Sequence, residues 1–246
     1  MDNFIFTQTA LKDFEKEYTC PSRWKGLYVD KLWKRTPTLS MLKGSYFEQL
    51  FIGRGAGPEI VNDLPRKKNG DKTIDQVRIE QQAQRAKELF DPNNSSWLGF
   101  IIKETQLNIK DVDREGTIDI LAEDKNVDNW LIDVKLTADL TSTWGDYAWG
   151  LGYDNLDLIQ LPHYQELYFR KWGFKPRIAL FIADYSPKMR IEFNEVVVTD
   201  DKLNDYDHRF KVARKIFNEY SESGFPVAPL KSECSVCKLE CKSRIL

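Results

Sequence analysis

The pattern of apolar residues changes twice along the chain. Helical patterns cover 8–35, with an interruption at Cys20-Pro21, then 43–52 and 74–90, and return at 155–171 and 201–221. The middle contains short β-prone stretches at 98–102, 103–107, 117–121 and 130–136, a continuous apolar stretch at 177–183 and an alternating one at 189–198. This order predicts an α/β domain with a mixed central sheet flanked by helices.

The charge balance limits the class of partner. The chain has 246 residues, enough for one large domain or two small ones, and a net charge of −2. Its pI is near 5.9, whereas a domain devoted to nucleic acid often has a pI above about 9, so a DNA-coating protein is not expected. Basic residues still form local groups: Lys31, Lys34 and Arg35; Arg66, Lys67 and Lys68; Arg170 and Lys171; Lys211, Arg214 and Lys215; Lys238, Lys242 and Arg244.

Neither a secretory signal nor a membrane span is expected. The first seven residues lack a basic start followed by a long apolar stretch. No stretch approaches the roughly 18 apolar residues that cross a bilayer. We therefore expect a cytoplasmic protein, in a bacterium or a phage-infected host, with no membrane partner.

The four cysteines have a spacing typical of a metal centre. Cys20 lies near the start, while Cys234, Cys237 and Cys241 form C-x-x-C-x-x-x-C. In a reducing cytosol this spacing is more often metal binding than disulfide. Tetrahedral zinc and cubane iron-sulfur centres both need a fourth sulfur, and Cys20 is the remaining cysteine. The alternative is that the thiols are unrelated and buried.

Two aspartates and a lysine lie within apolar strands. Asp119 follows Ile118, and Asp133 and Lys135 flank Val134, so Asp133 and Lys135 face the same side of their strand. If the two strands pair, Asp119 lies beside Asp133, and the two carboxylates form a hard oxygen site for Mg²⁺ or Mn²⁺. Lys135 is then placed to stabilise a phosphate. The alternative is a solvent-facing Asp-Lys pair on an edge strand.

Other polar residues lie on the predicted helices. Glu48 is on the 43–52 helix among core candidates, where the spacing alone favours a surface charge. Gln160 and Tyr164 are four residues apart and share a helical face, from which an amide and a phenol can contact a phosphate or a base. Core and rim roles are the more common ones for such residues, and Pro162 between them indicates a helix start or a kink.

Together, these residues resemble a known family. Glu48, Gly116-Thr117-Ile118-Asp119, Asp133-Val134-Lys135 and Gln160-x-x-x-Tyr164 are similar to the ordered motifs of the PD-(D/E)XK nuclease superfamily, in its RecB-like branch. Phe14, Cys20-Pro21-Ser22-Arg23-Trp24-Lys25 and the C-terminal cysteines resemble its iron-sulfur subset, which includes CRISPR-associated adaptation exonucleases, AddB-type nucleases and phage relatives. The match runs from about residue 7 to residue 241.

The resemblance implies a fold and a set of roles. The fold is a restriction-endonuclease-like core whose N- and C-terminal segments are joined by a metal cluster. Glu48, Asp119, Asp133 and the Val134 carbonyl hold Mg²⁺ or Mn²⁺, and Lys135 is the catalytic lysine. Gln160 and Tyr164 contact DNA. The cluster is [4Fe-4S] on Cys20, Cys234, Cys237 and Cys241, with structural Zn²⁺ as the alternative.

Two departures and one further residue qualify this assignment. Many relatives have His where this chain has Glu48, so the metal preference is expected to differ. The gap before Cys241 is shorter than is common in relatives, which leaves the cluster type more open than the involvement of the cysteines. We expect a supporting role near the site for Glu104.

The expected function is a metal-dependent DNA nuclease. We expect one domain over 1–246, with a helical part at about 1–95, a nuclease core at about 96–200 and a cysteine-bearing end at about 201–246. An exonuclease on single strands or DNA ends is expected, with a recombination, replication or CRISPR adaptation protein as a possible partner. The alternative is a DNA-end binding or adaptor module with little catalysis of its own.

Overall fold

The described chain forms two compact units. The computed structural model describes residues 4–15, 20–32, 36–53, 64–141, 143–144, 147–148 and 159–225. The first unit comprises 1–36, 111–115 and 200–246, and the second comprises 37–110 and 116–199. The expected assignment of 1–246 to a single domain stays a prediction.

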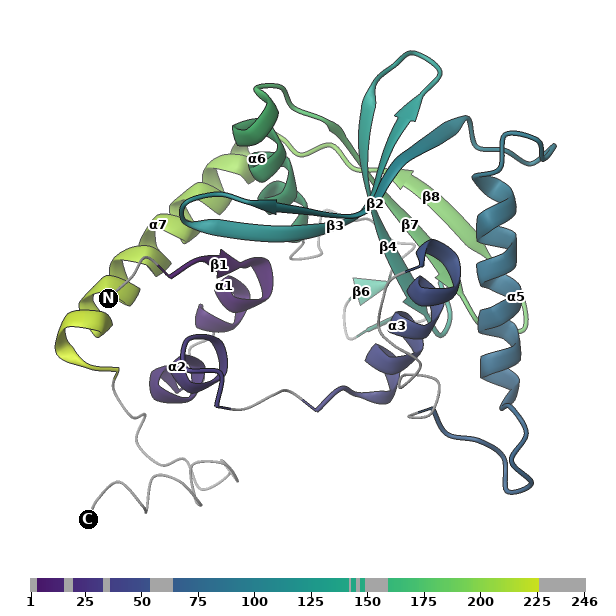
Figure 1. The fold of residues 1–246 in the computed structure, drawn as a ribbon, viewed down its shortest axis with the longest axis horizontal. Helices are drawn as coiled ribbons and strands as arrows, with labels where there is room; N and C mark the ends of the chain where they lie inside the picture. The colour runs from purple at the N-terminus through teal and green to yellow at the C-terminus, as the bar shows by residue number, and fades with distance from the viewer. Residues whose placement is uncertain are drawn as a thin grey trace. The chain divides into compact units, whose positions relative to one another are not determined.

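The second unit contains most of a mixed sheet (Figure 1). The path through the sheet is β1-β3-β4-β7-β8, and β2 also pairs with β3. β3 and β4 are antiparallel, β4 and β7 are parallel, and β7 and β8 are antiparallel. The strands are β2 (Phe100–Lys110), β3 (Arg114–Asp124), β4 (Asn129–Thr137), β7 (Arg177–Asp184) and β8 (Ile191–Glu195). This confirms the predicted mixed α/β class with a flanked central sheet.

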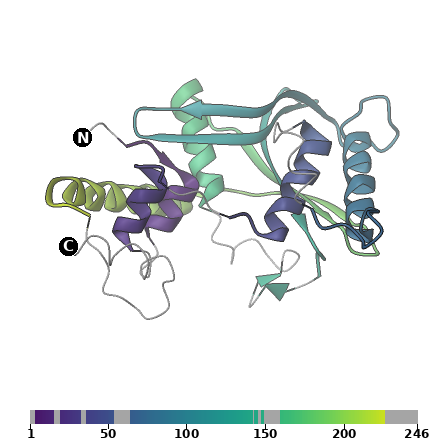
Figure 2. The same ribbon diagram turned by 60° about the horizontal axis from the view of Figure 1, so that its bottom comes forward.

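Three helices cover the two faces of this sheet (Figure 1 and Figure 2). On one face, α3 (Leu39–Ile52) and α5 (Ile74–Leu89) pack on alternate strand residues such as Ile132 and Val134. On the other face, α6 (Gln160–Trp172) packs on residues such as Leu131 and Leu180. Strand side chains alternate between faces, so β4 and β7 contribute to both cores.

The ends of these helices have clear local causes. The Thr38 and Thr73 hydroxyls accept from the N–H groups of Met41 and Gln76, and so cap α3 and α5. Gly173 ends α6 at φ 81°, a left-handed conformation that favours glycine. Pro162 lies in the first turn of α6, where a missing N–H costs little, so it marks a helix start.

The first unit is built around aromatic rings. It contains β1 (Phe6–Thr7), α1 (Gln8–Phe14), α2 (Pro21–Tyr28) and α7 (Asp200–Ser223). β1 pairs in parallel with the first residues of β3. The ring of Phe6 contacts Trp24 and Phe217 at centroid distances of 5.8 and 5.7 Å. β1 and α2 therefore meet α7 through aromatic packing in this unit.

The structure corrects one strand assignment. The stretches 98–102 and 103–107, predicted as two strands, form the single strand β2 (Phe100–Lys110). No turn residue separates Ile102 from Lys103, and the hairpin turn comes later, where the Asp111 N–H donates to the Arg114 carbonyl at 2.8 Å. A separate pair of two-residue strands, β5 (Thr143–Trp144) and β6 (Tyr147–Ala148), follows β4. Within the described residues, no helix has the length and apolar character needed to cross a bilayer.

Candidate functional site

The pairing of β3 with β4 brings the two strand aspartates together. Ile120 pairs with Ile132 in the register, so the next position places Asp119 opposite Asp133. The Val134 N–H donates to Asp119 Oδ2 at 2.9 Å. Both aspartates are buried, with 5% of Asp119 and 2% of Asp133 exposed. The predicted strand pairing is confirmed, and the solvent-facing alternative for Asp133 is wrong.

Asp133 is the centre of a polar cluster on the α6 face of the sheet. Its Oδ2 lies 2.6 Å from Lys135 Nζ. Its Oδ1 accepts from Gln160 Nε2 at 2.8 Å, and the same amide group donates to the Tyr164 hydroxyl at 2.8 Å. Lys135 Nζ also donates to Gln160 Oε1 at 3.4 Å. The four residues that the sequence singled out on β4 and α6 therefore form one cluster.

The electrostatics of this cluster oppose ionisation of Asp133. Burial raises the pKa of Asp133, and the nearby carboxylates of Asp119 and Glu48 raise it further, while Lys135 lowers it. The result is a pKa of about 7. Burial lowers the pKa of Lys135, but the charges of Asp133, Asp119 and Glu48 outweigh it, so the pKa of Lys135 is raised and it stays an ammonium. Several carboxylates thus share one cation in a poorly solvated place.

Gly116 is needed for the fit of α6 against β3. A Cβ at this position would lie 2.9 Å from Cε1 of Tyr164 and 3.0 Å from Cδ1 of Leu167. Real Cβ atoms do not approach other atoms this closely, so the Tyr164 ring occupies the space that the missing side chain leaves. The absence of a side chain at Gly116 therefore lets α6, the helix that carries Gln160, pack closely on β3.

The other two carboxylates predicted for the site, Glu48 and Glu104, differ in burial. Glu48 is half-buried on α3 and acts on Asp133 through its charge. Glu104 is exposed on β2, and its role stays a prediction. The β2 side chain that reaches the site is Gln106, whose Nε2 donates to Asp119 Oδ1 at 3.4 Å. Sequence reasoning missed Gln106, although it lies two positions from Glu104 and so on the same face of a regular strand.

The carboxylate oxygens near this cluster are the type of ligand that a hard divalent cation prefers. Asp119, Asp133 and Glu48 are carboxylates, which Mg²⁺ and Mn²⁺ prefer to nitrogen or sulfur ligands. Within the described ranges, however, no three His, Cys, Asp or Glu residues are grouped closely enough to hold a metal ion. In this geometry the Lys135 ammonium, at 2.6 Å, supplies the positive charge next to Asp133.

The cysteine prediction falls mostly outside the described residues. Cys20 is buried and precedes Pro21 at the start of α2. Cys234, Cys237 and Cys241 lie outside the described residues, as do the basic residues Lys34, Arg35, Lys238, Lys242 and Arg244. The expected [4Fe-4S] cluster, with Zn²⁺ as its alternative, stays a prediction.

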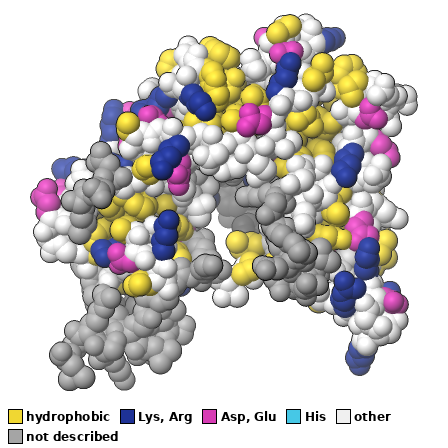
Figure 3. Space-filling model, in the orientation of Figure 1, with side chains coloured by type: hydrophobic (Ala, Val, Ile, Leu, Met, Phe, Trp, Pro, Cys, Tyr) yellow, Lys and Arg dark blue, Asp and Glu magenta, His cyan; other side chains and the backbone are white. Residues whose placement is uncertain are grey.

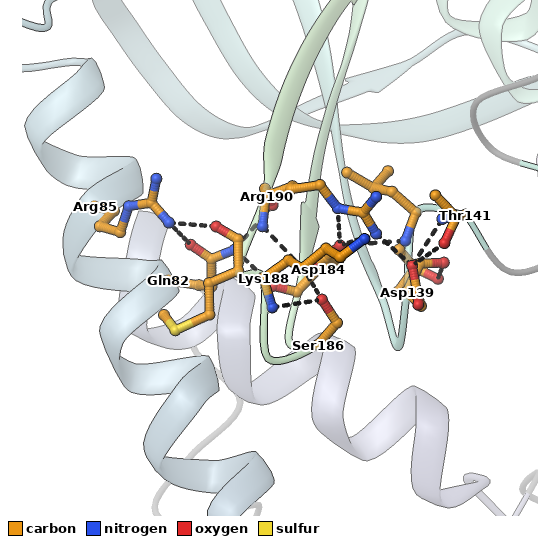
Figure 4. A network of polar contacts seen from close by, with 11 residues as sticks. Gln82, Arg85, Asp139, Thr141, Asp184, Ser186, Lys188 and Arg190 are labelled. Carbon is orange, nitrogen blue, oxygen red and sulfur yellow. Dashed lines mark hydrogen bonds and ion pairs between the residues drawn. The ribbon is translucent and has the colours of Figure 1, made fainter.

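A second polar network holds the segment that leaves β4 (Figure 4). Asp184, at the end of β7, is fully buried. Its carboxylate accepts from the N–H groups of Leu140 and Arg190 at 3.2 and 3.0 Å, from Ser186 Oγ at 2.9 Å and from Arg190 Nε at 2.9 Å. Arg190 also pairs with Asp139. The network therefore fixes the chain just after the strand that carries Asp133 and Lys135.

The comparisons with known proteins support the fold. The family models that were searched give no match, and neither do the curated proteins. Among solved structures, a "putative exonuclease" from Eubacterium rectale aligns with a TM-score of 0.65 and 18% identity, over 97% of this chain and 88% of that chain. The protein SSO0001 aligns with a TM-score of 0.37 and 15% identity, over 100% of this chain and 89% of that chain. The likeness to the first structure shows a shared fold.

Proposed function

We propose that the chain is a metal-dependent nuclease that hydrolyses phosphodiester bonds in DNA. The observation that carries the proposal is the convergence of Lys135 and Gln160 on the two buried aspartates, Asp119 and Asp133. Burying several carboxylates beside one ammonium costs folding free energy, and such clusters of ionisable groups with shifted pKa values are typical of functional sites. The similarity in fold to the Eubacterium rectale protein supports the same conclusion.

The residues would divide the chemistry between them. Asp119, Asp133, Glu48 and the Val134 carbonyl would hold Mg²⁺ or Mn²⁺, which supplies a polarised phosphoryl oxygen and a water of lowered pKa. Lys135 would place its ammonium against the charge that develops on the phosphate. Gln160 would orient Asp133 through the bond of 2.8 Å, and with Tyr164 would contact the nucleic-acid strand.

The finer assignment follows the sequence resemblance. We propose a RecB-like PD-(D/E)XK nuclease, acting as an exonuclease on single-stranded DNA or DNA ends in recombination, repair, replication or CRISPR adaptation. The C-terminal cysteines and Cys20 would hold a [4Fe-4S] cluster. Protein purified without oxygen would then be brown, whereas a colourless protein with one zinc ion would assign zinc instead.

A cleavage assay tests the proposed activity. Labelled single- and double-stranded DNA is incubated with the protein and Mg²⁺ or Mn²⁺, and with EDTA in place of the metal. We expect cleavage that EDTA abolishes and that both Asp119→Asn and Lys135→Met reduce by at least about a hundredfold. Glu123→Gln is the matched control, because Glu123 lies on β3, as Asp119 does, but pairs with the half-exposed Lys103.

The outcomes separate the proposed activities. Strands labelled at the 5′ or the 3′ end, followed over time, distinguish exonuclease from endonuclease action and give the polarity. Cleavage that both active-site variants leave unchanged would show that the cluster is not the active site. No cleavage by intact, metal-loaded protein would contradict the proposal.

One observation favours a second candidate, a DNA-end binding or adaptor module. Within the described part of the chain no three ligand-type side chains are grouped to hold a metal ion. Asp133 is instead occupied by Lys135 and Gln160. Tight DNA binding without any turnover in Mg²⁺ or Mn²⁺ would select this candidate.

A further inference from the structure

The C-terminal end of α6 presents an unusual surface. Residues 169–175 have the sequence Phe-Arg-Lys-Trp-Gly-Phe-Lys and are all exposed. This segment, here called the α6 end, holds three aromatic and three basic residues and no acidic one. Three large rings stand at 37–45% exposure: Phe169, Trp172 and Phe174. Figure 3 shows hydrophobic side chains gathered in this region with Lys and Arg side chains beside them.

A buried tyrosine fixes two of these rings. The Trp172 ring lies 4.2 Å from that of Tyr168, with 31° between their planes, and Phe174 meets Tyr168 edge-on at 5.4 Å. Tyr168 itself is only 3% exposed. Contacts with Tyr168 therefore hold the rings of Trp172 and Phe174 in place. Because these rings are already ordered before a ligand binds, the entropic cost of stacking is lower.

Gly173 makes this arrangement possible. Its φ of 81° ends the helix, and its N–H donates to the Phe169 carbonyl at 2.7 Å. The left-handed turn brings Phe174 back against Tyr168, the residue that Trp172 also contacts. A side chain at position 173 would meet no atom within 4 Å, so the backbone conformation alone explains the glycine.

The charges of the α6 end favour an anionic ligand. Lys171 Nζ lies over the Trp172 ring, 4.5 Å from its centroid. Arg170 pairs with Glu166 one turn earlier. Beyond Lys175, Arg177 is neutralised by Glu195 at 2.7 Å, so the basic segment ends there. Cations interleaved with exposed rings suit a ligand that carries both phosphates and flat bases.

We propose that the α6 end is a binding site for single-stranded nucleic acid, on which bases stack against Trp172 and Phe174 while Lys171 contacts the phosphates. A duplex hides its base faces, so the rings select a single strand. Gln160 lies at the opposite end of the same helix, about 18 Å away at 1.5 Å per residue. Under the proposed nuclease function, the site would hold the strand whose end reaches Gln160 and Asp133.

Binding in the absence of metal tests this site apart from catalysis. A fluorescein-labelled oligothymidylate of 15 nucleotides is titrated with the full chain in EDTA, and anisotropy is followed at several salt concentrations. Trp172→Ala is expected to weaken binding by about 5- to 150-fold, since stacking contributes roughly 1–3 kcal/mol per base. Trp172→Phe keeps a ring and should recover most of the affinity.

Charge gives a second, independent readout. Lys171→Gln is expected to lower the slope of log affinity against log salt by about 0.7, the value for one phosphate contact with a single strand. Lys211→Gln is the matched control, because Lys211 is 74% exposed on α7 and its change in charge is the same. Neither substitution removes a buried group, so both variants should remain folded.

The results decide between this site and its alternatives. Unchanged affinity in Trp172→Ala together with an unchanged salt slope in Lys171→Gln would overturn the proposal. Self-association through the α6 end, seen by light scattering and lost in Trp172→Ala, without oligonucleotide binding, would also overturn it and show a protein interface. Oligonucleotide binding without DNA cleavage would contradict only the nuclease function. DNA cleavage, together with binding that neither Trp172→Ala nor Lys171→Gln changes, would contradict only the site at the α6 end.

Discussion

Replacing Asp184 with asparagine is expected to destabilise the second unit by about 4 kcal/mol. Each carboxylate oxygen accepts one backbone N–H: Oδ1 from Arg190 and Oδ2 from Leu140. Each also accepts one side-chain group, Ser186 Oγ or Arg190 Nε. Whichever oxygen becomes the amide nitrogen, two donors lose their acceptor, one of them buried and the other part-buried. At about 1–3 kcal/mol for each unsatisfied group, the cost is about 4 kcal/mol.

Thermal and urea unfolding measure this effect. For a chain of this size, about 4 kcal/mol corresponds to a fall in Tm of roughly 8–16 °C. Asp139→Asn is the matched control, because Asp139 pairs with the same Arg190 but its side chain is 42% exposed. An exposed pair contributes at most about 1 kcal/mol, so the control should stay close to the wild type.

The pH dependence gives a further check. Burial raises the pKa of Asp184, but hydrogen bonds from Arg190, Leu140 and Ser186 outweigh it and lower the pKa below its usual value. A lowered pKa stabilises the folded state above the unfolded pKa of about 3.9, and this stability is lost as the pH falls through the folded value. The difference between wild type and Asp184→Asn should therefore shrink in acid. A loss below about 1 kcal/mol at pH 7, or one equal to that of Asp139→Asn, would refute the reasoning.

Three other substitutions give separate tests. Gly116→Ala should cost about 1–3 kcal/mol in urea unfolding and lower cleavage, because the new Cβ would lie 2.9 Å from Tyr164; a neutral effect would contradict this contact. The free energy of unfolding of the metal-free protein should fall by up to about 4 kcal/mol as the pH rises from about 4 through 7. The reason is that Asp133, with its raised pKa, keeps its proton in the folded state but loses it in the unfolded state. Asp133→Asn should remove this dependence of stability on pH, and a dependence that persists would have to come from another group. Arg114→Met should cost about 2–4 kcal/mol in the same assay, because the buried guanidinium lies 3.8 Å from the Phe210 ring centroid and pairs with Asp113; unchanged stability would show that the methionine replaces these contacts.

Much of the local structure and part of the site follow from residue patterns. The helical patterns at 43–52, 74–90 and 201–221 correspond to α3, α5 and α7 within a few residues. Asp133 and Lys135 were predicted on one face of a strand from their spacing alone, and Val134 on the other, as the core packing confirms. These features depend on neighbours a few positions away, and the period of a strand or helix encodes them directly.

Other features depend on contacts between distant segments. Gln106 reaches Asp119, and its φ of 56° shows that β2 departs from regular strand geometry at this residue, which the alternation of the sequence does not predict. The pairing of Gln160 with Asp133 depends on where α6 lies on the sheet, and the missing side chain of Gly116 leaves room for the close approach of α6.

The sequence by itself determined the α/β class, the strand positions of Asp119, Asp133 and Lys135, and the helix that carries Gln160 and Tyr164. Only the tertiary structure decided that these residues form one cluster, that Asp184 holds the segment after β4, and that Trp172 and Phe174 share the support of Tyr168. The physical reason is that periodicity sets which way a side chain points, whereas strand register and helix placement set what it meets there.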